Sequence, residues 1–545
     1  MTITRLDWAV LIAYLLAISG IGLIAGYRVR HTREYFLGDR KFGPWVLISQ
    51  CFSVGTHAEM PVALAGAVYA IGASAIWFQW KNLFITPLYW IMAPVFRRVR
   101  RTTMAEVFED RYGRFMGTIY IVFAVCFFII NIGTLLKGAG KVLSQATGAT
   151  TGVNEIVVVM TMLFVLYSFV GGLMASARTD VLQGLLIIVL SFMLIPLGWE
   201  VVGGLSGMKA ALPASRFSLS TPSGIGPWVI LMLTINGLVG IMAQPHMLAA
   251  VGTGRDERTC RVGMLHGNFV KRVCTVGWML VGLIVAAMIA QGGDHSDLLT
   301  DPENAFGFAC RRLLFPGALG LLIASILAAS MSACSAFMVG VGALFTAGLY
   351  RPHLAPNRSD GHYLWVGRIS GMTLTMLGVL YAVFFIQSVL YAFLLTETLA
   401  TYVGISLVGG IVWPRANRWG AAASLFVALT VNFLLYFFAG QRLDQWDPNV
   451  FLAALASGIL ALVVVSLVTA PEPAASIGSL FARLQTSSDE PDAPARPLLL
   501  VNALRLRRAA PRGVWRTFRE DLVGLAVGSA MVVALVGATA WFLAL

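Results

Sequence analysis

Long apolar segments recur from one end of this chain to the other, and they limit its fold more than any other feature. A helix that crosses a bilayer needs about 20 mostly apolar residues. Charged residues make up 12% of the 545 residues, against about 25% in soluble proteins. We therefore predict an all-α integral membrane protein with about 14 transmembrane helices. The predicted spans are residues 6–26, 43–70, 73–96, 115–137, 153–172, 180–203, 226–249, 270–291, 317–347, 363–385, 388–413, 419–439, 448–469 and 521–543.

The distribution of positive charge predicts the orientation. Arg28, Arg30 and Arg33 follow the first span instead of preceding it, so this segment is a retained helix and not a signal peptide. With the N-terminus outside, most of the 39 Lys and Arg residues fall on one side of the membrane, which the positive-inside rule makes cytoplasmic. The net charge of +13 therefore reflects topology and needs no nucleic-acid partner. We expect a multi-pass protein of the plasma membrane.

The spans divide the chain into blocks. Two blocks hold five predicted helices each, and an odd number of crossings makes them inverted relative to each other. The expected divisions are an N-terminal helix with the first inner loop (1–42), a first inverted repeat (43–204), a second inverted repeat (226–413), two peripheral helices (414–470), a flexible cytoplasmic tail or linker (471–520) and a C-terminal transmembrane helix (521–545).

Two spans carry polar and helix-breaking residues at membrane depth. Residues 53–61 of the second span include Gly55, His57, Glu59 and Pro61, and residues 236–246 of the seventh span combine Gly, Gln, Pro and His. Pro removes a helical hydrogen bond, and the freed backbone groups cannot face lipid. A matched pair of interrupted helices in two halves is the sequence pattern of a transporter binding site. We therefore predict a transporter with two helices broken near the bilayer midplane.

A motif between the fifth and sixth spans is the most specific in the chain. Residues 167–175 read YSFVGGLMA and residues 179–184 read TDVLQG. This motif resembles the signature of the sodium:solute symporter family, and further similarities extend the resemblance over roughly residues 35–415. They lie at residues 35–40, Glu59, Gly66, Tyr69, 78–80, 327–332 and 410–413. The resemblance implies the leucine-transporter-type fold, with five plus five inverted helices, and sodium-coupled symport of a small polar organic solute by alternating access. It implies no cofactor beyond the ion. We expect a single chain to be the functional unit, while the oligomeric state stays open.

The resemblance also implies an ion site between the first broken helix and the eighth core helix. Matching positions supply the carbonyls of Ser53, Thr56 and Ala329 and the hydroxyl of Ser332. The family's second serine is replaced here by Ala333, which leaves this site one oxygen short.

A second ion site, present in some family members, is matched in part by Asp180 and Ser335, whereas Ala336 replaces a serine. Sodium is the ion we expect. Protons are the main alternative, with His57, Glu59, His246 and Glu397 as candidate carriers, and uncoupled transport is a further one.

The expected solute site combines both breaks. Polar and ionisable side chains inside spans are costly and mark functional sites. By resemblance, Gln79, Asn82 and Gln244 match substrate-contact positions and His246 matches an inner aromatic gate, while His57 and Glu59 lie at the first break. The string 244–246 resembles proline transporters, whereas Glu59 resembles sugar-type members. Amino acids, monocarboxylates and sugar-like solutes therefore all stay open.

Three further charged side chains lie inside predicted core spans and are candidate intramembrane charge partners: Lys81, Lys137 and Glu397. We expect Lys81 either to pair with Glu59 or Glu397, or to bind an anionic group of the solute. On a regular helix, residues two apart point about 200° apart, so Lys81 would face away from Gln79 and Asn82 and meet another helix.

Other classes of function lack support in the sequence. The loops contain no nucleophile elbow, P-loop or zinc-binding spacing, so we do not expect an enzyme. A transport-inactive membrane receptor is the remaining alternative, and neither the solute nor the oligomeric state can be read from the sequence.

Overall fold

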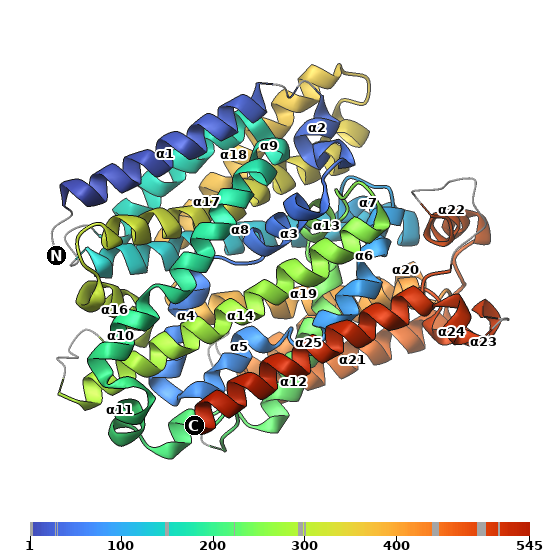
Figure 1. Cartoon of the computed structure of the whole chain (residues 1–545). Coiled ribbons are helices and arrows are strands. Elements are labelled where there is room, and N and C mark those ends of the chain that lie inside the picture. Colours follow the sequence, from blue (N-terminus) through green and yellow to red (C-terminus); the bar gives the residue numbers. More distant parts are fainter. Residues whose placement is uncertain are drawn as a thin grey trace.

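The described part of the chain is helical. The computed structural model describes residues 4–27, 29, 31–147, 152–222, 224–292, 298, 301–438, 446–487, 497–510 and 513–545. Arg28 and Arg30, which follow the first span, lie outside these residues. Ten of the described helices are long and apolar enough to cross a membrane, and they run roughly side by side (Figure 1). The predicted all-α membrane class is therefore confirmed.

Nine long helices of the described residues overlap predicted spans. Some begin at a residue such as Ser359, Ser388 or Asp447, whose side chain accepts a hydrogen bond from a first-turn N–H. These helices are α1 (Arg5–Gly26), α8 (Arg114–Ala146), α14 (Glu257–Ala290), α17 (Ala318–Phe345), α18 (Asp360–Phe384), α19 (Val389–Val412), α20 (Arg418–Phe438), α21 (Pro448–Val468) and α25 (Arg519–Ala544).

The two predicted breaks are present in the structure. The second span consists of α3 (Pro44–Ser53) and α4 (Glu59–Ile71), with non-helical residues between them. The seventh span consists of α12 (Pro227–Gly240), the 3₁₀ turn η5 (Ile241–Ala243) and α13 (Met247–Val251).

The third predicted span is wrong as a continuous helix. It consists of η2 (Ala73–Ile76), α5 (Trp77–Trp80), η3 (Thr86–Leu88) and α6 (Tyr89–Arg98). Pro87 lies in η3, and proline disfavours helical geometry in the residue before it. The apolar composition predicted the crossing, whereas the turn after α5 depends on Pro87 and on packing.

The helix of the signature motif bends at a glycine. α9 (Val153–Phe192) contains Gly172 with φ 55° and ψ −150°, and α10 (Leu194–Val202) follows it. A Cβ atom on Gly172 would lie 2.3 Å from the Tyr35 ring. Glycine is required here by both the backbone angle and the close approach of Tyr35. Residues 173–179, which we expected to form a loop, are helical.

α17 forms the centre of the fold. Its most apolar stretch is completely buried, and it packs against α1, α8, α9 and α18. Many of its residues are Ala, Ser or Gly, which let membrane helices approach closely. A second group of helices, α3, α4 and α6, packs around α14. The first break lies where these two groups meet.

Short helices connect the long ones. They are α2 (Thr32–Leu37), η1 (Gly38–Arg40), α7 (Met104–Tyr112), α11 (Gly204–Ala211), η4 (Ala214–Phe217), η6 (Pro302–Asn304), α16 (Ala305–Leu313), the π-helix η7 (Thr346–Leu354), α22 (Ala474–Gln485), η8 (Ala503–Arg505), α23 (Leu506–Ala509) and α24 (Val514–Thr517). Both chain termini lie at one end of the long helices, whereas α2, α7 and α22 to α24 gather at the other end (Figure 1).

Part of the segment that we expected to be a flexible tail is docked onto the helices. α22 packs on α7, and Arg483 of α22 pairs with Asp110. Just before α22, Glu472 pairs with Arg418 at 2.7 Å, and this contact holds the pKa of Glu472 below its usual value. The expectation of flexibility is wrong for these residues, because ion pairs to α7 and to the first residue of α20 hold them. Residues 488–496 and 511–512 of the expected tail lie outside the described residues.

We predict that Gly172→Ala destabilises the protein. The strained backbone alone should cost about 1–3 kcal/mol, and Tyr35 must also move. Thermal unfolding in detergent, followed by tryptophan fluorescence, should show a lowered midpoint. The control is Gly20→Ala in α1, where a Cβ would meet no atom within 4 Å. Equal midpoints for the two variants would contradict this explanation of the glycine.

Candidate solute and ion site

A cavity lies where both broken helices meet. Its walls come from the first break, α5 and the turn after it, η5 with its following turn, α14 and α19. The empty space, its opening included, is about 690 Å³. Gln79, Lys81 and Asn82 all line it. The expectation that Lys81 faces away from Gln79 and Asn82 is wrong, because α5 ends at Trp80 and the following turn redirects Lys81.

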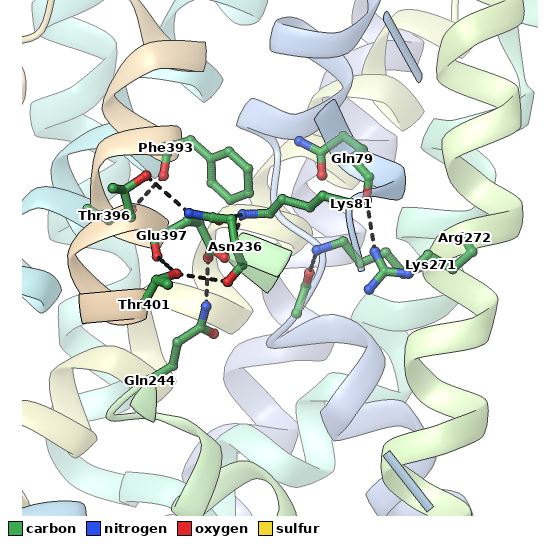
Figure 2. Close-up of polar contacts among 12 residues, drawn as sticks. Gln79, Lys81, Asn236, Gln244, Lys271, Arg272, Phe393, Thr396, Glu397 and Thr401 are labelled. Atoms are coloured by element: carbon green, nitrogen blue, oxygen red, sulfur yellow. Dashed lines mark hydrogen bonds and ion pairs between the residues drawn. The ribbon is translucent and has the colours of Figure 1, made fainter. Parts of the chain in front are cut away.

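Glu397 of α19 organises one wall of the cavity. One of its oxygens, Oε2, accepts from Lys81 Nζ at 2.7 Å, and Oε1 accepts from Gln244 Nε2 at 2.7 Å (Figure 2). Of the two carboxylates considered for Lys81, the structure therefore pairs it with Glu397. Lys81 is 1% exposed and also lies 4.8 Å from the centre of the Phe393 ring. A buried charge needs such a partner.

Two cations that we did not predict lie on the opposite wall. Lys271 Nζ donates to the Gly55 carbonyl at 2.5 Å, and Arg272 Nη1 donates to the Gln79 carbonyl at 3.1 Å (Figure 2). Among the described residues, neither cation pairs with a carboxylate, and Arg272 Nε and Nη2 are buried without a hydrogen-bond partner. This wall of the cavity therefore presents two basic side chains.

The sequence contained a signal for these two cations. The predicted span began at residue 270, which assigned Lys271 and Arg272 to its cytoplasmic end. α14 begins much earlier, at Glu257, where the Asp256 side chain caps it by accepting from the Thr259 N–H. A search for this cap would have started the helix at Glu257, and both cations would then have been placed well inside the helix and away from its end.

His57 joins the first break to Glu59. Its Nδ1 lies 2.8 Å from Glu59 Oε1, and its Nε2 lies 2.6 Å from the Val54 carbonyl oxygen. Glu59 itself packs against α8, where a Cβ on Gly138 would lie 2.3 Å from its Cβ. Among the predicted solute contacts, Glu59 does not line the cavity, but it contacts His57, which does.

Aromatic rings close the cavity beside α17. The Phe337 ring lies 5.7 Å from the His57 ring and 5.2 Å from the His246 ring. His246 also stacks on Phe127 at 6.1 Å. These contacts bring His246, expected as an inner gate, to the same wall as His57.

The expected ion ligands gather next to the first break. Ser332 Oγ donates to Asp180 Oδ1 at 2.6 Å, and Ser53 Oγ donates to the Asp180 carbonyl at 3.0 Å. Ala329 lies buried on α17 just before Ser332. These contacts join α3, α9 and α17.

Unpaired oxygens in this region fit a hard cation. Asp180 Oδ2, Thr56 Oγ1 and Ser335 Oγ are buried without a hydrogen-bond partner among the described residues. Buried polar atoms normally have partners, and oxygen ligands of this kind suit a sodium ion.

Lys137 does not belong to the site, so its expected role as an intramembrane charge partner is wrong. It is partly exposed and donates to Asn154 Oδ1 at 3.2 Å. Lys141, one turn further along α8, pairs instead with Asp301 and Glu303. Lys137 and Lys141 are one turn apart on α8, and it is Lys141 that contacts Asp301 and Glu303.

Comparison with known proteins supports a transporter. A model of the sodium:solute symporter family matches residues 35–428, which confirms the resemblance seen in the sequence. The chain is 25% identical over 489 residues to the osmoregulated proline transporter OpuE of Bacillus subtilis (strain 168), covering 87% of this chain and 96% of the relative. It is 24% identical over 491 residues to sodium/myo-inositol cotransporter 2 of Mus musculus, covering 81% and 72%.

A solved structure shares the fold. The structure of a Na⁺-coupled sialic acid symporter, in a substrate-bound outward-open state, superposes with a TM-score of 0.73 at 19% identity, covering 86% of this chain and 98% of that chain. A nucleobase-cation-symport-1 family transporter superposes with a TM-score of 0.53 at 13% identity, covering 83% and 98%.

We predict strong energetic coupling between Lys81 and Glu397. Removing one partner leaves a buried charge, so Lys81→Met or Glu397→Gln alone should cost about 3–5 kcal/mol. The double variant should cost much less than the sum of both. Thermal unfolding of all four proteins gives the coupling energy. Lys41→Met is the control, because the Lys41 side chain is 77% exposed. Additive losses would show that the pair is not coupled.

Proposed function

Because the chain belongs to the sodium:solute symporter family, we propose that it is a secondary active transporter that couples sodium to the symport of a small polar organic solute by alternating access. Its relatives are transporters and not enzymes. The observation that carries the proposal is the buried cavity at two broken helices, lined by polar and charged side chains. The receptor alternative predicts solute binding without accumulation in proteoliposomes.

We propose fourteen crossings, with residues 43–204 and 226–413 as inverted repeats of five helices each. An even number of crossings agrees with both termini lying at the same end of the long helices (Figure 1). The positive-inside rule places this end outside the cell and α22 in the cytoplasm. The protein would thus be a multi-pass protein of the plasma membrane.

We propose that the solute carries a carboxylate. Lys271 and Arg272 face the cavity without a carboxylate partner among the described residues, whereas Glu397 compensates Lys81. Arg and Lys bind carboxylates through strong charge-assisted hydrogen bonds. The buried Gln79 Nε2 and Asn82 Oδ1 lack hydrogen-bond partners among the described residues, and they supply a donor and an acceptor for a further polar group of the solute.

A panel of solutes tests this assignment. Small carboxylates, such as lactate and proline, should raise the unfolding temperature of the purified protein more than glucose or myo-inositol does. Loss of a charge-assisted hydrogen bond costs about 1.5–3 kcal/mol, so Lys271→Gln should weaken carboxylate binding by roughly tenfold or more. Lys41→Gln is the exposed control. A preference for uncharged solutes, or unchanged binding in Lys271→Gln, would disprove the carboxylate.

We propose that sodium binds between the first break and α17, with Asp180, Ser332, Ser335, Thr56, Ser53 and Ala329 as its ligands. The unpaired buried oxygens of Asp180, Ser335 and Thr56 support this site, and Asp180 compensates for the oxygen that Ala333 lacks. An ion here would hold α3 against α17 and α9, and so order the neighbouring cavity. Its release would let the two helix groups separate.

We predict that Asp180→Asn and Ser332→Ala each raise the sodium concentration needed for half-maximal uptake by about tenfold or more, as expected for a lost charge or ligand. Uptake into proteoliposomes at varied sodium concentration measures this. Ser325→Ala is the matched control, because Ser325 is a buried serine of α17 whose one hydroxyl hydrogen bond within the described residues is to its own helix, at the Leu321 carbonyl. Unchanged sodium dependence in both site variants would exclude this site.

Proton coupling is a second candidate, favoured by the contacts of His57. Both ring nitrogens of His57 face acceptors, namely Glu59 and the Val54 carbonyl. A neutral histidine has only one N–H, so both hydrogen bonds form only when the His57–Glu59 pair carries one proton more than a neutral histidine with an ionised glutamate. Uptake that persists without sodium, follows an inward proton gradient and is lost in His57→Gln would establish protons as the coupling ion.

A further inference from the structure

A second, strongly basic pocket lies away from the solute cavity. α2, η1, the end of α6 and the π-helix η7 line it, at the end of the molecule where α7 and α22 also lie (Figure 1). Five of its lining residues are arginines and none is acidic: Arg33, Arg40, Arg97, Arg100 and Arg351. Its empty space, the opening included, is about 1260 Å³.

Within the part of the chain that the structure describes, the arginines have few anionic partners. Arg33 pairs with Asp39 at 3.0 Å. Arg40, Arg97 and Arg100 donate to the carbonyls of Arg101, Arg255 and Ser487. Arg351 lies 5.1 Å from the centre of the Tyr363 ring. Each guanidinium has five N–H donors, so these contacts orient the side chains and leave donors for a ligand.

Unusual backbone geometry surrounds this pocket. Asp39, Arg40 and Arg100 are the three non-glycine residues with positive φ in the described chain. Such conformations are costly and cluster at ligand-binding sites. Thr346 and Arg351 lie on η7, and π-helical segments are also frequent at functional sites. The hydroxyl of Thr346 is buried without a hydrogen-bond partner among the described residues.

The positive charges lie close enough to repel one another. Burial, together with the charges of Arg97 and Arg33, lowers the pKa of Arg40 to about 10. A bound anion would relieve this repulsion, because an opposite charge at short distance favours the charged form.

We propose that this pocket binds a phosphate-bearing anion. The planar guanidinium fork matches phosphate oxygens in pairs, and the space exceeds what a single phosphate ion fills. The ligand is therefore a larger phosphate compound, supplied either by a soluble metabolite or by an anionic phospholipid headgroup. The proposed orientation places the pocket in the cytoplasm, and ligand binding to the pocket can be measured without any transport.

Binding to the purified full-length protein tests the proposal. Pyrophosphate is the soluble probe, and dihexanoyl phosphatidylglycerol is the lipid probe, with the zwitterionic dihexanoyl phosphatidylcholine as its blank. The assay is thermal unfolding at constant ionic strength. Stabilisation by pyrophosphate identifies a soluble ligand, and stabilisation by phosphatidylglycerol alone identifies a lipid headgroup. No saturable effect of either probe would overturn the proposal.

Two pairs of arginine substitutions test whether the phosphate compound binds in this pocket. Arg97→Gln with Arg351→Gln removes two charges from the pocket and should weaken binding by at least tenfold. Arg505→Gln with Arg508→Gln removes the same charge from exposed positions outside it and should leave the affinity unchanged. Equal losses in both pairs would mean non-specific attraction and overturn the site. If the first pair does not fold, Arg97→Lys with Arg351→Lys keeps the charge but loses the fork, and its affinity should still fall.

Discussion

Backbone carbonyls at the broken helices need hydrogen-bond donors, and the rest of the structure depends on how these are supplied. In a bilayer, water cannot satisfy such groups from the lipid side. Here side chains do so: His57 contacts the Val54 carbonyl, and Lys271 donates to Gly55. Arg272 donates to the Gln79 carbonyl.

At the second break, Thr401 donates to the Asn236 carbonyl and Tyr120 donates to the Ala243 carbonyl. The breaks therefore draw polar residues from α14, α19 and α8 into the centre of the protein.

Some of these donors, such as Lys271 and Arg272, are basic side chains, and they determine the chemistry of the cavity wall. Lys81 is neutralised by Glu397, which also orders Gln244. Lys271 and Arg272 are held by carbonyls, which orient a cation without neutralising it. Buried charge of one sign is costly unless an opposite charge arrives. The proposed carboxylate of the solute would supply this negative charge. The stability of the cavity would then depend on whether the solute is bound.

Much of the site could be predicted from residue types and spacing. Gly55, Pro61 and Pro245 marked the breaks, because proline and glycine disturb helices irrespective of their surroundings. The family motif led to Asp180, and the structure joins Asp180 to Ser332. The turn after α5 could not be predicted, because an apolar segment with two prolines is compatible with both a kinked helix and a broken one. The docking of α22 could not either, because it depends on an ion pair with the distant Asp110.

The sequence by itself determined that the chain is a helical membrane protein with two interrupted helices. Bilayer crossing depends on the composition of about 20 consecutive residues, which is a local property. Only the tertiary structure decided that Lys81 meets Glu397 and not Glu59, and that Lys271 and Arg272 face the cavity. Lys81 and Glu397 are 316 residues apart in the chain. Their contact depends on how separate helices rotate and pack against each other. A local pattern of residues cannot predict a contact between positions so far apart in the chain.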